Sequence, residues 1–159
     1  MSETATPVDL LAALLNETLA AGVRVADDGN LYLELGDGQG VVVSPSPDGE
    51  DIVLHCALAM LGSTADAGLM TAALACNLHQ AQTRGGAIGL DPDAQLLVFS
   101  WRLPTRTLDS PDDLLALLDG FCATAGELSG RLEEAAARVA DLGGPWADPA
   151  SEAHGCRPG

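Results

Sequence analysis

Residues 96–104 read Leu96-Leu97-Val98-Phe99-Ser100-Trp101-Arg102-Leu103-Pro104, and this stretch decides the fold. Large apolar side chains occupy every second position over residues 97–103, which predicts a β-strand with one strongly apolar face. Leu96 and Val98 make the opposite face apolar as well. Antiparallel sheets of small proteins commonly leave one face in water. A strand with two apolar faces therefore indicates that helices cover both sides, or that another chain covers one of them.

Helices and further strands are predicted on both sides of this stretch. Thr6, Ser63 and Ser110 precede three predicted helices, where their side chains can cap the first turn. We expect helices over residues 6–21, 63–84 and 110–142, and strands over residues 31–35, 41–43, 51–60, 87–90 and 95–103. This order, α-β-β-β-α-β-β-α, predicts an α+β fold: a mainly antiparallel, twisted sheet with helices. We expect one domain over residues 6–142, with flexible termini at residues 1–5 and 143–159.

The first and last predicted helices carry apolar patterns that bear on association. A helix packed by one side needs an apolar stripe about 100° wide. The first helix has a wider one, so we expect part of this set to be exposed: Leu10, Leu11, Leu14 and Leu15. In the last helix, apolar residues recur at steps of four and three from Leu114 onward, which predicts packing on the sheet with a projecting end.

Composition excludes several classes of function. The chain has 159 residues and a formal net charge of −16, and all seven of its Lys+Arg residues are arginine. Without lysine it lacks the phosphate-binding lysine of Walker A loops and any Schiff-base lysine. The acidic charge disfavours nucleic acid and anionic membranes as partners. We expect a cytoplasmic protein, since the N-terminal residues are acidic and polar and the four cysteines are widely spaced.

Motifs for catalysis or metal binding are weak. Gly36, Gly38 and Gly40 are spaced as in a phosphate loop, but valines follow them instead of a helix, so we expect a hairpin turn. His55 and Cys56 are adjacent in a predicted strand, so their side chains point to opposite faces and cannot hold one ion. The sequence therefore predicts no catalytic residues, no metal site and no cofactor.

The ordered set of elements resembles the class I type III secretion chaperones, the Tir-chaperone (CesT-like) family. Four stretches carry the resemblance: Leu74-Ala75-Cys76-Asn77-Leu78, Gly86-Ala87-Ile88-Gly89-Leu90-Asp91, the strand over residues 96–104, and residues 108–121 at the start of the last helix. The resemblance covers residues 10–142, and the long last helix with its Gly/Pro tail departs from the family pattern.

The resemblance implies a bacterial, cytoplasmic homodimer without ATPase activity. Such a chaperone binds an extended N-terminal segment of a secreted effector and keeps it export-competent. The partner-binding residues would then be Leu10, Leu11, Leu14 and Leu15 of the first helix, with Leu33, Leu35 and Val42 of the first strands. The dimer interface would include Met70, Leu74, Phe99 and Trp101.

Two other functions fit the sequence. A regulatory protein of the same fold would sequester a secretion regulator that is not exported. A small enzyme or sensory domain would use a similar fold for a ligand. The fate of a co-purified partner distinguishes the chaperone from the regulatory protein, and ligand or metal analysis reveals the third class.

Overall fold

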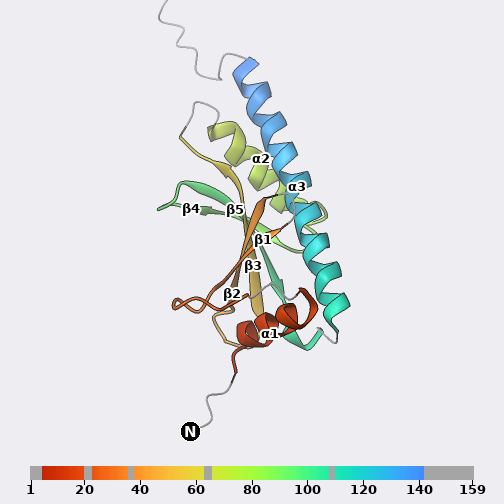
Figure 1. Cartoon of the computed structure of the whole chain (residues 1–159). Helices are drawn as coiled ribbons and strands as arrows, with labels where there is room; N and C mark the ends of the chain where they lie inside the picture. Colours follow the sequence, from red (N-terminus) through yellow and green to blue (C-terminus); the bar gives the residue numbers. More distant parts are fainter. Residues whose placement is uncertain (1–4, 20–22, 36–37, 63–65, 108–109, 142–159) are drawn as a thin grey trace, which may run out of the picture.

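The computed structural model describes residues 5–19, 23–35, 38–62, 66–107 and 110–141 (Figure 1). Within these ranges the elements are α1 (Pro7–Leu19), β1 (Leu31–Leu35), β2 (Gln39–Pro45), β3 (Ile52–Met60), α2 (Asp66–His79), β4 (Ala87–Asp91), β5 (Leu96–Leu103), a short 3₁₀ helix (Thr105–Thr107) and α3 (Pro111–Asp141). The predicted α+β fold and the order of its elements are confirmed.

The described strands form one antiparallel sheet in the order β1-β2-β3-β5-β4. Its centre is the pairing of β3 with β5, which runs from Ile52 opposite Leu103 to Met60 opposite Leu96. The register shifts between Ala57 and Ala59, as a β-bulge does. The neighbours β2 and β4 then extend the sheet on either side, and β1 and β4 are its edges.

All the described helices lie on one face of this sheet (Figure 1). The long helix α3 crosses that face and continues beyond it beside α2. The ring of Phe121 on α3 stacks on Phe99 of β5 with centroids 5.1 Å apart, and on Trp101 at 6.2 Å. The predicted repeat of α3 is buried against the sheet and α2: Leu114, Leu118, Phe121, Ala125, Leu128 and Leu132.

Caps fix the starts of two helices where the sequence predicted them. The backbone amide of Asp9 donates to Thr6 Oγ1 at 3.2 Å, and the Asp9 carboxylate accepts from the Thr6 amide at 2.9 Å. At α3 the Asp113 amide donates to Ser110 Oγ at 3.2 Å, and the Ser110 hydroxyl donates to Asp113 Oδ2 at 2.7 Å. Such reciprocal bonds satisfy amides that have no partner inside the helix.

The predicted end of the second helix is wrong. The sequence suggested a helix up to residue 84, but α2 ends at His79 and a turn follows. Gln80 and Arg84 both have φ of 48°, in the left-handed region that interrupts a helix. The Asn77 amide group bonds the backbone of Ile88 in both directions, at 2.8 Å each. This pair of bonds fastens the end of α2 to β4, and the chain turns back between the two over residues 80–86.

Gly86 is required by a close approach of two chain segments. A Cβ atom at this position would lie 2.5 Å from Phe99 Cε2 and 2.7 Å from the carbonyl oxygen of Ser100. No side chain fits there without moving the backbone of β5, so β4 can begin beside β5 only from a glycine.

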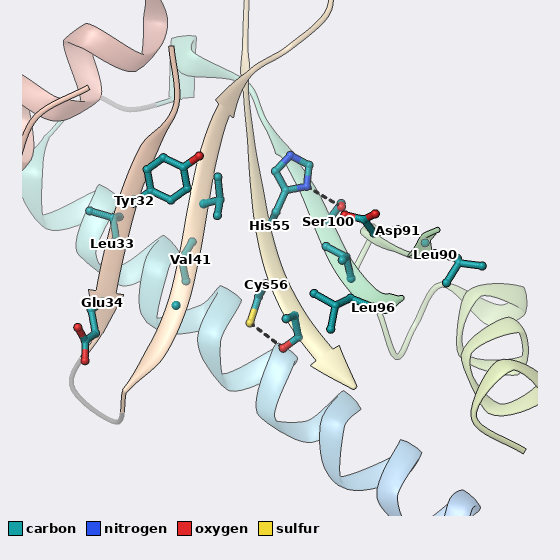
Figure 2. Close-up of a pocket in the computed structure, with 15 residues that line it drawn as sticks. Tyr32, Leu33, Glu34, Val41, His55, Cys56, Leu90, Asp91, Leu96 and Ser100 are labelled. Atoms are coloured by element: carbon teal, nitrogen blue, oxygen red, sulfur yellow. Dashed lines mark hydrogen bonds between the residues drawn. The ribbon is translucent and has the colours of Figure 1, made fainter. Parts of the chain in front are cut away.

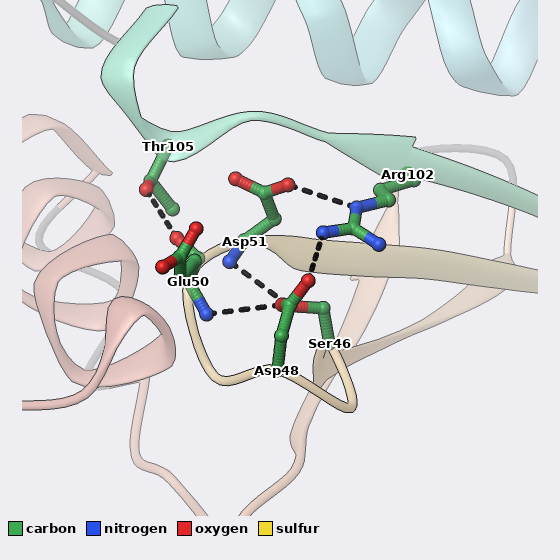
Figure 3. A network of polar contacts seen from close by, with 6 residues as sticks. All are labelled: Ser46, Asp48, Glu50, Asp51, Arg102 and Thr105. Carbon is green, nitrogen blue, oxygen red and sulfur yellow. Dashed lines mark hydrogen bonds and ion pairs between the residues drawn. The ribbon is translucent and has the colours of Figure 1, made fainter.

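A polar network joins the β2–β3 turn to β5 (Figure 3). Arg102 Nε donates to Asp51 Oδ2 at 2.8 Å, and its Nη2 donates to Asp48. The buried Ser46 hydroxyl donates to Asp48 and accepts from the Asp51 amide at 2.9 Å. The hydroxyl of Ser46 and then the guanidinium of Arg102 hold the pKa of Asp48 well below its ordinary value near 3.8.

This network makes a testable contribution to stability. A carboxylate whose pKa is lowered on folding stabilises the protein above its ordinary pKa, and that stabilisation disappears as the pH falls toward the folded value. We therefore expect Arg102→Gln to lower the melting temperature at pH 7, and to lower it less at a pH below about 3.8, when unfolded Asp48 is protonated. Thermal unfolding followed by circular dichroism measures both. The exposed Arg131→Gln on α3 is the control, and an Arg102→Gln effect that is the same at both pH values would contradict the assignment.

Candidate functional site

The described surface carries three apolar regions that a partner could contact. The first is a groove at the edge of the sheet, between β1, α1 and α3, which we call the edge groove. The second is the α2 stripe, made of Met70, Leu74 and Leu78. The third is the sheet-face groove, over the face that the described helices leave uncovered. The sequence analysis predicted none of these three regions in full. Each region nevertheless contains a predicted residue or lies beside one.

The edge groove has a volume of about 400 Å³ and a mainly apolar lining, with Arg24, Glu34 and Asp119 as its charged members. Leu33 and Leu35 of β1 face it, because residues at every second position of a strand share a face. Leu15 of α1 and Leu115 of α3 line it from the other side. The strand β1 beside it is an edge of the sheet, and in the described part of the chain its outer side makes one isolated bridge, from Val25 to Leu31.

The structure divides the four predicted leucines of α1. Leu10 is 60% exposed, and Leu14 is half-buried against the core. Leu11 and Leu15 are only 2% and 1% exposed, because they face the sheet and α3. The excess of leucine on this helix is therefore real but small: Leu11 belongs to the core, Leu15 touches the edge groove from the core side, and Leu10 is the exposed member.

Val42 does not join the other predicted partner-binding residues. It is paired with Tyr32 in the β1–β2 register, whereas Leu33 is paired with Val41. Paired residues share a face, and successive residues alternate between faces. Val42 thus lies on the uncovered face of the sheet, opposite to the face of Leu33 and Leu35.

The predicted dimer residues also separate into two groups. Phe99 is fully buried and Trp101 is half-buried, and both rings stack on Phe121. The face of β5 that carries these two aromatic residues therefore packs on α3 of the same chain. Met70 and Leu74 are 40% and 69% exposed on α2. Met70 and Leu74 are thus the exposed pair among the four predicted residues.

Two exposed leucines, one in the α2 stripe and one beside it, were not selected by the sequence analysis. Leu78, one helical turn after Leu74, is 77% exposed, and Leu90 on the adjoining strand β4 is 48% exposed. Large apolar side chains at intervals of four residues on one helix share a face. The spacing of Met70, Leu74 and Leu78 could have predicted this stripe from the sequence. It was hard to recognise because α2 is apolar on nearly all sides, so that no one face stands out.

The sheet-face groove has a volume of about 770 Å³ and is shown in Figure 2. Every strand of the sheet contributes to its lining. Its apolar part includes Val42, Ala57, Leu96 and Val98. The sequence analysis found the two-sided apolar strands that produce this face, but it did not show which face the helices would leave open.

Two polar side chains in the sheet-face groove have defined partners. His55 Nδ1 lies 2.8 Å from Ser100 Oγ, and burial lowers the pKa of His55, which favours a neutral imidazole at pH 7. The Tyr32 hydroxyl donates to Asp28 Oδ2 at 2.6 Å, and this bond raises the pKa of Tyr32. These contacts orient the two rings at one side of the groove, where they can pack against a ligand.

Two other features would indicate a function: a cluster of metal ligands and a helix that spans a membrane. Among the described residues there is no group of three or more His, Cys, Asp or Glu side chains that could hold a metal ion. His55 and the buried Cys56 lie on opposite faces of β3, as their adjacency predicted. Within the described ranges, no helix is both long enough and apolar enough to cross a membrane.

Comparisons with known proteins agree with this geometry. No curated protein matches the chain. Three solved complexes share the fold: the HopA1–SchA chaperone–effector complex (20% identity, 78% of this chain and 91% of that chain, TM-score 0.55), the Yersinia pestis type III secretion chaperone SycH with a stable fragment of YscM2 (19%, 77% and 99%, 0.55) and the ExsC–ExsE complex (18%, 78% and 86%, 0.52). The model of the Tir chaperone protein (CesT) family matches residues 9–129. That match spans most of the sequence, and the chain belongs to the Tir chaperone protein (CesT) family.

Proposed function

We propose that this protein is a type III secretion chaperone that binds an extended segment of a secreted effector and keeps it ready for export. Family membership supports the class of function. The observation that carries the proposal is the edge groove beside an edge strand. A segment that pairs with the outer side of β1 gains backbone hydrogen bonds, and its alternate side chains can enter the groove lined by Leu33 and Leu35.

The exposed apolar surface fits a client that is not folded. Ordering an extended segment costs several kcal/mol, about 2–5, so a chaperone that binds one needs a broad apolar surface. Leu10, Tyr32 and the two grooves provide such a surface. The formal charge of −16 keeps these apolar patches soluble through mutual repulsion between molecules. Nothing in this function requires a catalytic residue or a cofactor, and it belongs in the bacterial cytoplasm, where effectors are held before export.

We further propose that the protein acts as a homodimer that pairs through the α2 stripe. Met70, Leu74 and Leu78 would otherwise leave a row of large apolar side chains in water. Leu90 extends the row onto β4. Two copies related by a twofold axis can bury the same stripe on both chains, as an isologous interface does.

The function is tested by isolating the partner. Tagged protein expressed in its native bacterium should co-purify a partner that mass spectrometry identifies as a secreted protein, and the bound region should include that partner's N-terminal segment. The secreted fraction then decides between the two binding functions: an effector is exported, whereas a regulator stays in the cell. Capture of no partner by protein that is folded and dimeric would contradict the proposal.

Two adjacent leucines of α1 give a matched pair of variants. Leu10→Asp places a charge at a position that is 60% exposed, so we expect its melting temperature to stay close to that of the wild type. Partner affinity should fall by about tenfold or more, because the complex would bury an unpaired charge. Leu11→Asp places the same charge in the core and should cost several kcal/mol, about 3–5, and unfold much of the protein. Thermal unfolding and partner co-elution measure both effects. A folded Leu10→Asp protein that binds at full strength would remove this part of α1 from the binding surface.

The α2 stripe gives an independent prediction. Leu74→Glu should convert the homodimer to a monomer of half the mass, because it puts a charge in the centre of an apolar interface. Light scattering coupled to size exclusion at micromolar concentration measures the mass. Ala123→Glu, at an exposed position of α3, is the control and should stay dimeric. A Leu74→Glu protein with the wild-type mass, or a monomeric wild type, would refute the interface.

A further inference from the structure

The sheet-face groove has a floor that runs across the strands. Glu34 of β1 pairs with Gly40 of β2, and Val98 of β5 pairs with both Ala57 of β3 and Gly89 of β4. The β2–β3 register, continued by one residue, brings Gly40 opposite Ala57. These residues therefore form one row on the uncovered face, and most of their side chains are small. Larger side chains of the groove lie in the rows on either side, among them Tyr32, Val42, His55 and Leu96.

Neither glycine of this row is required by the chain itself. A Cβ atom at Gly40 or at Gly89 would meet no atom within 4 Å, and neither residue has a positive φ. Glycine inside a strand costs stability, because it gives up conformational entropy and has no side chain to pack. Within a strand it also marks places where a ligand or another backbone approaches closely. Both glycines lie in the lining of an open groove, where a ligand or another backbone could approach closely.

The charge around the groove selects the kind of occupant. Glu34 ends the row on the edge strand β1, and Asp91 lies on the opposite edge strand β4, two residues from Gly89 and in the neighbouring row of Leu96. A carboxylate is therefore found near each end of the row. No arginine is found among the described residues that line the groove. His55, between them, is kept toward its neutral form by burial. A second copy of a chain with a formal charge of −16 would bring more acidic charge to these carboxylates, whereas a cationic segment would be attracted.

From these observations we propose that the sheet-face groove binds an extended segment of the secreted partner in which small apolar and polar side chains alternate and a lysine or arginine lies at each end. The assignment rests on the proposed chaperone function and specifies the chemistry of its client. The two edge strands are four strand spacings apart, which is about 19 Å, and an extended chain covers that span in about six residues. The segment that binds here is thus short, and it differs from the segment paired with β1 at the edge groove.

Two synthetic peptides test the charge and the shape of this site. One has a lysine at each end of six residues in which valine and serine alternate, and the other has glutamates in place of the lysines. We expect the lysine peptide to bind the full-length protein about tenfold or more tightly than the glutamate peptide, with an affinity that falls as salt rises. Amide signals of β1 to β5 in NMR titrations report binding at this face. The double variant Glu34→Gln, Asp91→Asn should abolish the difference between the peptides, and asparagine keeps the oxygen that accepts from the Asp93 amide.

The shape of the floor is tested by filling it. Gly89→Val should lower the affinity for the lysine peptide by about tenfold or more without lowering the melting temperature, because valine suits a strand and its Cβ meets no neighbour. Gly126→Ala is the matched control: this α3 glycine also has open space at its Cβ, and its replacement should leave peptide binding unchanged. Equal binding of both peptides, absence of binding, or full affinity of Gly89→Val would overturn the proposal.

The remaining outcomes identify other occupants or separate this proposal from the chaperone function. If Gly89→Val turns a dimer into a monomer, a second copy occupies the groove and the proposal is wrong. The full-length protein could also fail to bind the lysine peptide while a variant without residues 143–159 binds it. The chain's own C-terminal residues would then be the occupant of the groove, and the proposal would be wrong. Failure of the peptides to bind a chain that still co-purifies a secreted partner defeats this assignment alone. Failure to capture any secreted partner defeats the chaperone function instead.

Discussion

The pairing of β3 with β5, and the packing of one face of that pair on α3, is the interaction on which the rest of the structure depends. The ring of Phe99 on β5 stacks on Phe121 of α3. The same ring and the backbone of Ser100 lie so close to position 86 that only a glycine fits there. The outer strands are added to this pair in order, β2 and then β1 on one side and β4 on the other. A loss of packing at Phe99 would therefore weaken the attachment of the outer strands, which is otherwise supported by the packing of α1 on β2 and of α2 on β4.

One-sided packing also explains why so much apolar surface is exposed. A sheet whose outer face is meant for water alternates apolar and polar residues. In β3 and β5 the outer face carries Val53, Ala57, Leu96 and Val98, and none of the described helices covers it. The helix α2 is also packed on one side only. It buries Leu69, Ala73 and Cys76 and leaves the α2 stripe exposed. A chain of this design holds its fold with one face of the sheet and leaves the apolar residues of the other face uncovered by the described helices.

The sequence predicted the elements better than the surfaces they form. Strong local signals, such as the Thr6 and Ser110 caps and the alternation of β1 and β5, gave the fold class and most boundaries. It could not show which face of a two-sided strand would be covered, because that depends on the side to which each connection carries its helix. For this reason the sequence predicts Leu11 and Phe99 near partners although both are core residues, and it groups Val42 with Leu33 and Leu35, which lie on the opposite face. Leu15 is also a core residue, but it lines the edge groove. The sequence predicts a turn at Gly40 and a short strand at Gly89. It cannot predict the groove that both glycines line, since a groove arises only when distant strands lie side by side.

The strand β4 belongs to two surfaces at once. Its residue Leu90 adjoins the α2 stripe, while Gly89 and Asp91 line the sheet-face groove, and the Asn77–Ile88 hydrogen bonds fasten the strand to the end of α2. If occupancy of the groove shifts the position of β4, it changes the affinity of one copy for another, and dimerisation must change the affinity for the client by the same factor. Cooperativity between client loading and subunit assembly would in that case need no additional device, since a single five-residue edge strand transmits it.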